Sequence, residues 1–159
     1  MKITIICVGK IKESFYRDAI DEFKKRLTKY VNLSFVELED EKTPDRASEA
    51  ENLMIKEKEG SRILSKIKDD DFVVALCIDG KKLDSVRFSD FINKKGIEGT
   101  KSLCFVIGGS LGLSDQVIKR ANYKLSFSDM TFPHQLMRVI LLEQIYRAYR
   151  IMKNEPYHK

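Results

Sequence analysis

The segment Phe105-Val-Ile-Gly-Gly-Ser-Leu-Gly112 decides the fold, because a short apolar strand runs directly into a glycine loop. The arrangement recurs after one short helical stretch. There, Leu125-Ser-Phe-Ser-Asp-Met-Thr-Phe-Pro-His-Gln135 leads from a strand into a loop rich in hydroxyl side chains. Ligands of open α/β sheets bind in such loops, at the carboxyl ends of the strands. Since a single helix separates the two loops, we expect them to lie side by side and to share one ligand.

The rest of the chain alternates between strand and helix patterns. We expect strands at Lys2–Val8, Asn32–Leu38, Phe72–Ile78, Ser102–Ile107 and Tyr123–Phe127. We expect helices at Glu13–Tyr30, Ala47–Ile67, Arg87–Lys95, Ser114–Ala121 and His134–Met152. Asp79-Gly80 is predicted to turn the chain, and Pro133 to lie in the first turn of the last helix. This alternation predicts a parallel sheet with helices on both faces, within a single domain 1–159.

Composition narrows the class of protein. The chain has 159 residues, of which 43% are hydrophobic and 33% charged, as in ordinary globular domains. No apolar run approaches the roughly 20 residues that span a bilayer. The apolar stretch at the N-terminus is too short for a signal peptide, so we expect a cytoplasmic protein. Cys7, Cys77 and Cys104 lie in expected buried strands without metal-like spacing, and with two histidines we expect no metal site.

Excess positive charge is confined to the last third of the chain. Residues 1–100 contain 20 Lys and Arg against 20 Asp and Glu, whereas residues 101–159 contain 9 against 4. This part of the sequence carries both loops, so the asymmetry suggests an anionic partner near the site. A chance excess on a solvated surface is the alternative.

The loop sequences exclude the two common nucleotide motifs. Gly108-Gly109-Ser110-Leu111-Gly112 has the spacing G-G-x-x-G, which differs from the dinucleotide fingerprint, and the chain has no G-x-x-x-x-G-K-[ST] phosphate loop. Adjacent glycines let the backbone approach a ligand closely, although an ordinary tight turn would explain them too. The second loop offers Ser126, Ser128 and Thr131 to a planar base, or serves only to cap the next helix.

The last helix and the tail complete the set of candidates. Residues 134–152 are apolar on nearly all sides, which predicts a two-fold dimer interface, with central burial in a monomer as the alternative. His134 and Arg138 share one helix face beside the second loop, and Glu143 with Arg147 forms a structural pair. The tail Asn154-Glu-Pro-Tyr-His-Lys159 is expected to be docked and functional, although terminal residues are commonly frayed.

These motifs together resemble the ribosomal RNA large subunit methyltransferase H family. The resemblance rests on both loops and extends over the whole chain, with further motifs at Met1–Lys10, Lys58-Glu-Gly60, Glu143-Gln-Ile-Tyr-Arg-Ala148 and Pro156-Tyr-His-Lys159. It implies a SPOUT-class enzyme, whose parallel α/β sheet ends in a trefoil knot near the C-terminus and which has no separate RNA-binding domain.

The resemblance also implies an activity and a set of site residues. Enzymes of this family are homodimers that use S-adenosyl-L-methionine to methylate N3 of a pseudouridine in helix 69 of 23S rRNA, acting on the assembled ribosome. The family's cofactor contacts correspond here to Leu76, Gly108, Phe127, Ser128, Asp129, Met130, Thr131 and Phe132.

Four residues are candidates for the chemistry of methyl transfer. His134 is the candidate base for the imide proton, or else a residue that caps the helix, and Arg138 would bind a phosphate or the developing imide anion. Tyr157 and His158 would close over the cofactor, within one subunit or across the dimer. Lys159 and Arg150 would meet RNA phosphates. Two alternatives remain open: a ribosome-binding factor without activity, and a generic nucleotide-binding enzyme.

Overall fold

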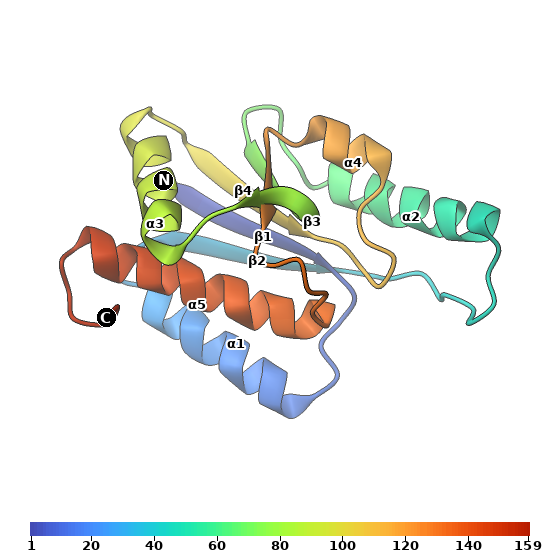
Figure 1. Cartoon of the computed structure of the whole chain (residues 1–159), viewed down its shortest axis with the longest axis horizontal. Helices are drawn as coiled ribbons and strands as arrows, with labels where there is room; N and C mark the ends of the chain where they lie inside the picture. The colour runs from blue at the N-terminus through green and yellow to red at the C-terminus, as the bar shows by residue number, and fades with distance from the viewer.

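Five parallel strands form one sheet in the computed structural model, which describes residues 1–159 (Figure 1). The strands are β1 (Lys2–Val8), β2 (Asn32–Leu38), β3 (Phe72–Lys82), β4 (Ser102–Ile107) and β5 (Tyr123–Ser126). They lie in the order β2-β1-β4-β3-β5, so β3, β4 and β5, which precede the candidate site residues, are neighbours at one side of the sheet. The predicted parallel α/β sheet is confirmed.

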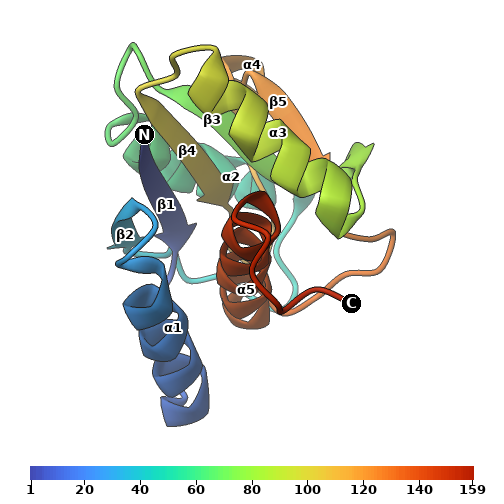
Figure 2. The ribbon, with the colours of Figure 1, turned by 90° about the vertical axis from the view of Figure 1, so that its left-hand side faces the viewer.

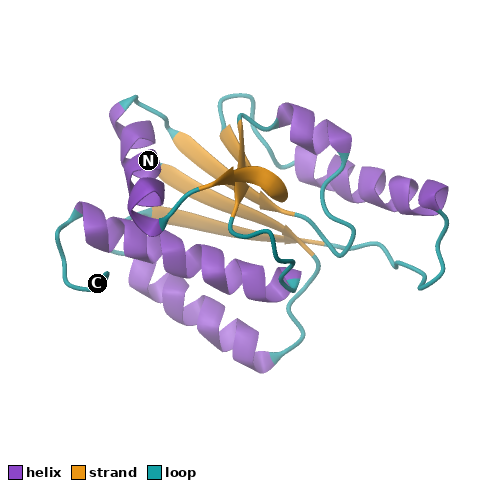
Figure 3. Cartoon of the chain, viewed as in Figure 1, coloured by secondary structure: helices purple, strands orange, loops and turns teal.

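Helices cover both faces of the sheet, as Figures 2 and 3 show. They are α1 (Ser14–Leu27), α2 (Glu49–Leu64), α3 (Ser85–Ile97), α4 (Asp115–Arg120) and α5 (His134–Met152). Apolar side chains of α1, α3 and α5 pack with one face of the strands into the larger core. Those of α2 and α4 form a smaller core with the other face. Because strand side chains alternate in direction, Ile3 and Ile5 belong to the larger core and Ile6 and Val8 to the smaller one.

Side-chain caps fix where three of the helices begin. Ser48 and Glu51 form a reciprocal capping box at the start of α2. Asp84 accepts a hydrogen bond from the backbone of Arg87 at the start of α3, and Ser114 accepts one from Val117 at the start of α4. Helix α3 thus begins two residues earlier than the sequence pattern predicted, because its cap lies three residues before Arg87, and it also ends two residues later.

The prediction of a turn at Asp79-Gly80 was wrong. Strand β3 continues to Lys82, and its pairing with β5 slips, so that both Leu76 and Lys81 lie opposite Leu125. A Cβ atom on Gly80 would lie 2.7 Å from the carbonyl carbon of Leu125. The glycine therefore permits close contact between two strands, at an irregularity of β3, where the sequence had suggested a turn.

Three further expectations change in detail. Pro133 is the N-cap of α5 and precedes its first turn. Cys77 is only half-buried, unlike Cys7 and Cys104, because it lies where β3 leaves the covered part of the sheet. Helix α5 lies between α1 and α3, and none of its large apolar side chains is fully exposed (Figure 2). Central burial therefore accounts for much of its apolar character.

Candidate functional site

A cavity of about 750 Å³ opens at the carboxyl ends of β3, β4 and β5. Its walls are the end of β3, the glycine loop after β4, the loop after β5 and the first turn of α5. The lining residues are Leu76, Cys77, Ile78, Ile107 to Leu113, Leu125 to Ser128, Met130 to His134, and Met137. The predicted proximity of the two loops is confirmed, and the volume is in the range of small-molecule sites.

The glycine loop is both a tight turn and a wall of this cavity. The Gly112 amide donates to the Gly109 carbonyl at 3.1 Å, and Gly112 has a φ of 83°, which favours glycine. A Cβ atom on Gly108 would lie 2.7 Å from the carbonyl carbon of Gly112. The simple-turn interpretation thus holds for the backbone, and the same turn exposes main-chain atoms to the cavity.

The second loop is braced by its own hydroxyl groups. Ser126 is buried and donates its hydroxyl to the Ser128 carbonyl at 3.0 Å, while the Ser128 hydroxyl accepts from the Met130 amide at 3.0 Å. Two of the three hydroxyls that the sequence offered to a ligand therefore hold the loop in shape. Thr131 is the one that makes no hydrogen bond within the chain.

Of the eight residues expected to contact a cofactor, seven line this one cavity. They are Leu76, Gly108, Phe127, Ser128, Met130, Thr131 and Phe132. Asp129 does not: its exposed carboxylate forms an ion pair with Lys82 at 2.5 Å. The loop residue that carries a charge is thus directed away from the cavity, and it ties the loop to the end of β3.

A second group of polar side chains surrounds Gly9, at the end of β1 and beside the cavity. A Cβ atom on Gly9 would lie 3.5 Å from Cε1 of His134, 3.7 Å from Nη2 of Arg138 and 3.8 Å from Cγ of Asp40. Gly9 has a φ of 94°, so a side chain there would be strained as well as crowded. His134 and Arg138 do share a face of α5, as predicted, and that face is turned toward the ends of β1 and β2.

Arg138, the predicted ligand of a phosphate or of the imide anion, is fully buried in this structure and has no surface exposed to solvent. Its Nη2 donates to the Val8 carbonyl at 2.8 Å and lies 3.3 Å from Nδ1 of His134. Its Nη1 lies 3.6 Å from Oε2 of Glu37, within ion-pair range but too far for a hydrogen bond. The guanidinium is therefore engaged inside the protein.

Glu37 joins this group to the start of α1. Its Oε1 pairs with Arg17 at 2.7 Å, and its Oε2 accepts from the Ile11 amide at 3.1 Å. Burial by itself raises the pKa of Glu37, but these hydrogen bonds and the charge of Arg138 outweigh it and lower the pKa overall. The pKa of His134 is lowered, first by burial and then by Arg138, against the opposing charges of Asp40 and Glu13.

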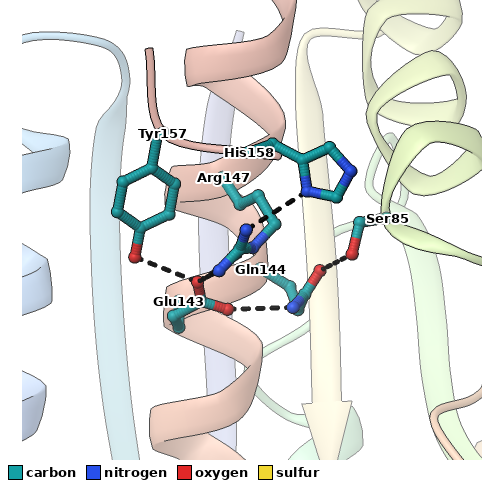
Figure 4. Close-up of polar contacts among 6 residues, drawn as sticks. All are labelled: Ser85, Glu143, Gln144, Arg147, Tyr157 and His158. Atoms are coloured by element: carbon teal, nitrogen blue, oxygen red, sulfur yellow. Dashed lines mark hydrogen bonds and ion pairs between the residues drawn. The ribbon is translucent and has the colours of Figure 1, made fainter.

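The tail is docked on α5 of the same chain (Figure 4). Tyr157 donates to Glu143 at 3.0 Å and lies under the guanidinium of Arg147, which also contacts His158 at 3.2 Å. Burial and the bond to Glu143 raise the pKa of Tyr157, so its hydroxyl stays protonated. Arg150, a candidate phosphate ligand, instead holds the tail through Glu155 and the Pro156 carbonyl.

The four candidate catalytic residues therefore form two separate pairs. His134 and Arg138 lie in the first turns of α5, beside the cavity, whereas Tyr157 and His158 contact Glu143 and Arg147 further along the helix. At a rise of about 1.5 Å per residue, those contacts are about 13–20 Å from His134 along the helix axis. The chain does not bring its own tail to its own cavity.

Glu59 and Gly60 are structural supports of the site that we did not assign from sequence. Glu59 is buried, and its Oε1 would lie 3.1 Å from a Cβ atom on Gly109, so it backs the glycine loop. Its pKa is raised, chiefly by burial. The Cα of Gly60 packs against Ser114, the cap of α4. The signal in the sequence was the Lys58-Glu59-Gly60 motif, whose role depends on contacts with residues about 50 positions away.

None of the helices is both long enough and apolar enough to cross a membrane. The structure contains no group of three or more His, Cys, Asp or Glu side chains that could hold a metal ion.

Comparison with known proteins gives one consistent result. The profile of the family described as Predicted SPOUT methyltransferase matches residues 1–158. The ribosomal RNA large subunit methyltransferase H proteins of Clostridium tetani and Clostridium acetobutylicum are 62% and 60% identical to the chain, and the protein named methyltransferase H 1 of Clostridium perfringens (strain SM101 / Type A) is 62% identical. Each match covers 100% of both chains. The chain therefore belongs to the ribosomal RNA large subunit methyltransferase H family of SPOUT methyltransferases.

Proposed function

We propose that the protein transfers a methyl group from S-adenosyl-L-methionine to N3 of pseudouridine 1915, in helix 69 of 23S rRNA, on the assembled ribosome. The observation that carries this proposal is the cavity at the ends of β3, β4 and β5, which gathers the family's two loops around one space. The names of the relatives support a substrate in the large ribosomal subunit. We accordingly place the protein in the cytoplasm, where assembled ribosomes are found.

The residues of the cavity suit S-adenosyl-L-methionine. That molecule combines a planar base, a ribose and a charged amino acid, so it needs apolar walls together with main-chain donors and acceptors. Leu76, Phe127 and Met137 supply apolar surface, and the glycine loop supplies main-chain atoms that no side chain covers. When bound, S-adenosyl-L-methionine supplies an electrophilic methyl group on a sulfonium.

The chain's own contribution is alignment. Holding donor and acceptor in register can lower the barrier by about 7–11 kcal/mol. The two loops fix the position of the donor, and the first turn of α5, at the edge of the cavity, faces an acceptor base that enters from the solvent side. We propose that the shape of the ribosome supplies much of the selectivity for one nucleotide, because residues 1–159 form one sheet with its covering helices and the cavity itself is sized for the donor.

We propose that the active protein is a homodimer in which the tail of one subunit completes the site of the other. The tail lies far from its own cavity along α5, yet it carries a tyrosine, a histidine and a lysine at the end of a helix with half-exposed apolar side chains. A two-fold contact through this region would place each tail beside the partner's cavity. Sedimentation analysis at micromolar concentration should give twice the chain mass of 18.4 kDa.

Methyl transfer to ribosomes tests the activity directly. Tritiated S-adenosyl-L-methionine should label ribosomes from a strain that lacks this gene, and mass spectrometry should locate the methyl group on the helix 69 pseudouridine. Ribosomes from the parent strain, which are already modified, and protein-free 23S rRNA are the controls, and neither should be labelled efficiently. Absence of label on unmodified ribosomes would favour a binding factor without activity.

Ligand binding separates this proposal from a generic nucleotide-binding enzyme. In a thermal-shift panel, S-adenosyl-L-methionine and its demethylated product should raise the Tm, whereas ATP and NAD should not. Stabilisation by ATP or NAD alone would point to the other class. This binding assay needs no ribosome, so it tests the cofactor independently of the substrate.

Truncation tests the tail. Deleting Pro156–Lys159 should lower the methylation rate at least about 100-fold, the scale of loss when a group that stabilises the transition state is removed. The circular dichroism spectrum should keep its helix and strand signal, because the deleted residues belong to no helix or strand and only Tyr157 packs against the edge of the larger core. Full activity of the truncated protein would exclude a role for the tail.

A further inference from the structure

We infer that Arg138 holds His134 as the tautomer with its proton on Nε2, so that His134 serves methyl transfer as a hydrogen-bond donor and not as the base. The identity of the methyl acceptor in this inference rests on the proposed function. The tautomer of the imidazole rests on the geometry alone. It reverses the role that the chemical type of the side chain suggests.

The contact between the two side chains decides the tautomer. Nη2 of Arg138 lies 3.3 Å from Nδ1 of His134. A guanidinium has only N–H donors and no acceptor, so Nδ1 must present its lone pair to Arg138. A proton on Nδ1 would set two donors against each other, which excludes both the other tautomer and the imidazolium as long as this contact persists.

Arg138 cannot turn away to relieve such a clash. The side chain has no exposed surface, and the same Nη2 donates to the Val8 carbonyl at 2.8 Å. Nη1 faces Glu37 at 3.6 Å, and Glu37 is held in turn by Arg17 at 2.7 Å. Arg138 is thus a positioning residue, which does not line the cavity and acts through His134, and Glu37 supports Arg138 without contacting His134.

The surroundings of His134 agree with a neutral ring. The groups that face it are Arg138 on α5, Asp40 after β2 and Glu13 at the start of α1. The two carboxylates favour the protonated ring, but burial and the charge of Arg138 outweigh them and lower the pKa of His134. The ring therefore remains neutral near pH 7.

The other ring nitrogen is free for the substrate. Nε2 makes no hydrogen bond within the chain, and His134 lines the cavity beside the second loop. In the proposed step the N3 proton of the imide passes to solvent water, and negative charge spreads to the two flanking carbonyl oxygens. N3 then bonds to the methyl carbon as the bond from that carbon to sulfur breaks, and the neutral thioether leaves. A preorganised N–H donor aimed at one of these oxygens would stabilise the charge as it develops. The Nε2–H group has the chemistry for this role.

Nitrogen NMR of the imidazoles tests the tautomer without any reaction. The chain has two histidines, so a His158→Asn variant assigns the signals of His134 unambiguously. In the wild-type protein at pH 7.5 we expect the proton on Nε2 and a pKa below the ordinary value of about 6.5. A proton on Nδ1, or on both nitrogens, would overturn the inference.

Variants of the positioning residues extend this test. In Glu37→Gln/Arg138→Met, which leaves no unpaired buried charge, both tautomers should be populated and the pKa of His134 should rise. The single variant Glu37→Gln is the matched control and should keep the proton on Nε2. An unchanged tautomer in the double variant would show that Arg138 does not set it.

Rates of methyl transfer test the role of His134 as a donor. Glutamine can donate a hydrogen bond but cannot act as a base, so His134→Gln should keep the single-turnover rate within about tenfold of wild type, whereas His134→Ala should lose about 10²–10³-fold. Equal losses in both variants, with loss of the acidic limb of the pH–rate profile, would assign His134 as the base. If wild-type protein transfers no methyl group to ribosomes, the proposed function fails while the NMR result stands.

Discussion

Replacing Gly60 by alanine should loosen the contact between α2 and α4 and weaken the cofactor site. A Cβ atom on Gly60 would lie 2.2 Å from Oγ and 3.0 Å from Cβ of Ser114. Ser114 is buried and its hydroxyl caps α4, so it cannot rotate away without losing that bond. Because only Leu113 separates Ser114 from the glycine loop of the cavity, a shift of α4 is passed to the loop.

The expected net effect is a loss of stability. Overpacking of this kind costs about 1–3 kcal/mol, and a lost cap about 1 kcal/mol. Alanine gains about 1 kcal/mol over glycine inside a helix, which offsets part of the cost. We therefore expect Gly60→Ala to lower the free energy of unfolding by about 1–3 kcal/mol, or the Tm by about 3–10 °C for a domain of this size.

Two further variants isolate the steric contact. Gly96 is also helical, but a Cβ atom there would meet nothing within 4 Å, so Gly96→Ala should leave the Tm unchanged or raised. Glycine caps a helix at a cost of only a few tenths of a kcal/mol relative to serine, so adding Ser114→Gly to Gly60→Ala should restore most of the stability.

The assays are thermal unfolding at one fixed protein concentration and calorimetric binding of S-adenosyl-L-methionine. Affinity should fall in Gly60→Ala and recover in the Gly60→Ala/Ser114→Gly variant, since the glycine loop is released from strain. If Gly60→Ala has the same Tm as Gly96→Ala, or if adding Ser114→Gly does not restore the Tm of Gly60→Ala, the reasoning about this contact is refuted.

Three more outcomes follow from the charges and thiols of the structure. The pKa of Glu37 is lowered in the folded state, so the ionised carboxylate stabilises the fold above the ordinary carboxyl pKa of about 4.3. This stabilisation is lost as the pH falls through the folded pKa. The Tm of Glu37→Gln should therefore depend less on pH between pH 3 and 5 than the Tm of the wild-type protein. Burial raises the pKa of Cys77 to about 11, so alkylation measured by mass spectrometry should be slow at pH 8, accelerate toward pH 10, and slow again when cofactor fills the cavity. Ribosome binding should weaken as salt rises, because phosphate contacts release counterions; affinity independent of salt between 50 and 200 mM would contradict a phosphate footprint.

Sequence patterns predicted the strands well because buried strands and their periodicity are local. The run at Ser102–Ile107 and the glycine loop after it predicted a strand with a ligand site at its end, and the structure has the strand there with a cavity at its end. The error at Asp79-Gly80 has a non-local cause. This dipeptide commonly turns a chain, but here Gly80 is required by the backbone of Leu125, a residue that local patterns cannot bring to it.

The side chains of the site show the same limit more sharply. The spacing of His134 and Arg138 was enough to predict that they share one helix face beside the second loop, and in the structure they are in contact. It could not predict which of them reaches the solvent, because the burial of Arg138 depends on Val8 and Glu37, each about 100 or more positions away in the chain. A contact between Nη2 and Nδ1 then removes the lone pair that a base would need. Residue type therefore indicated which side chains to consider, while the contacts of each atom followed from the strands that α5 packs against.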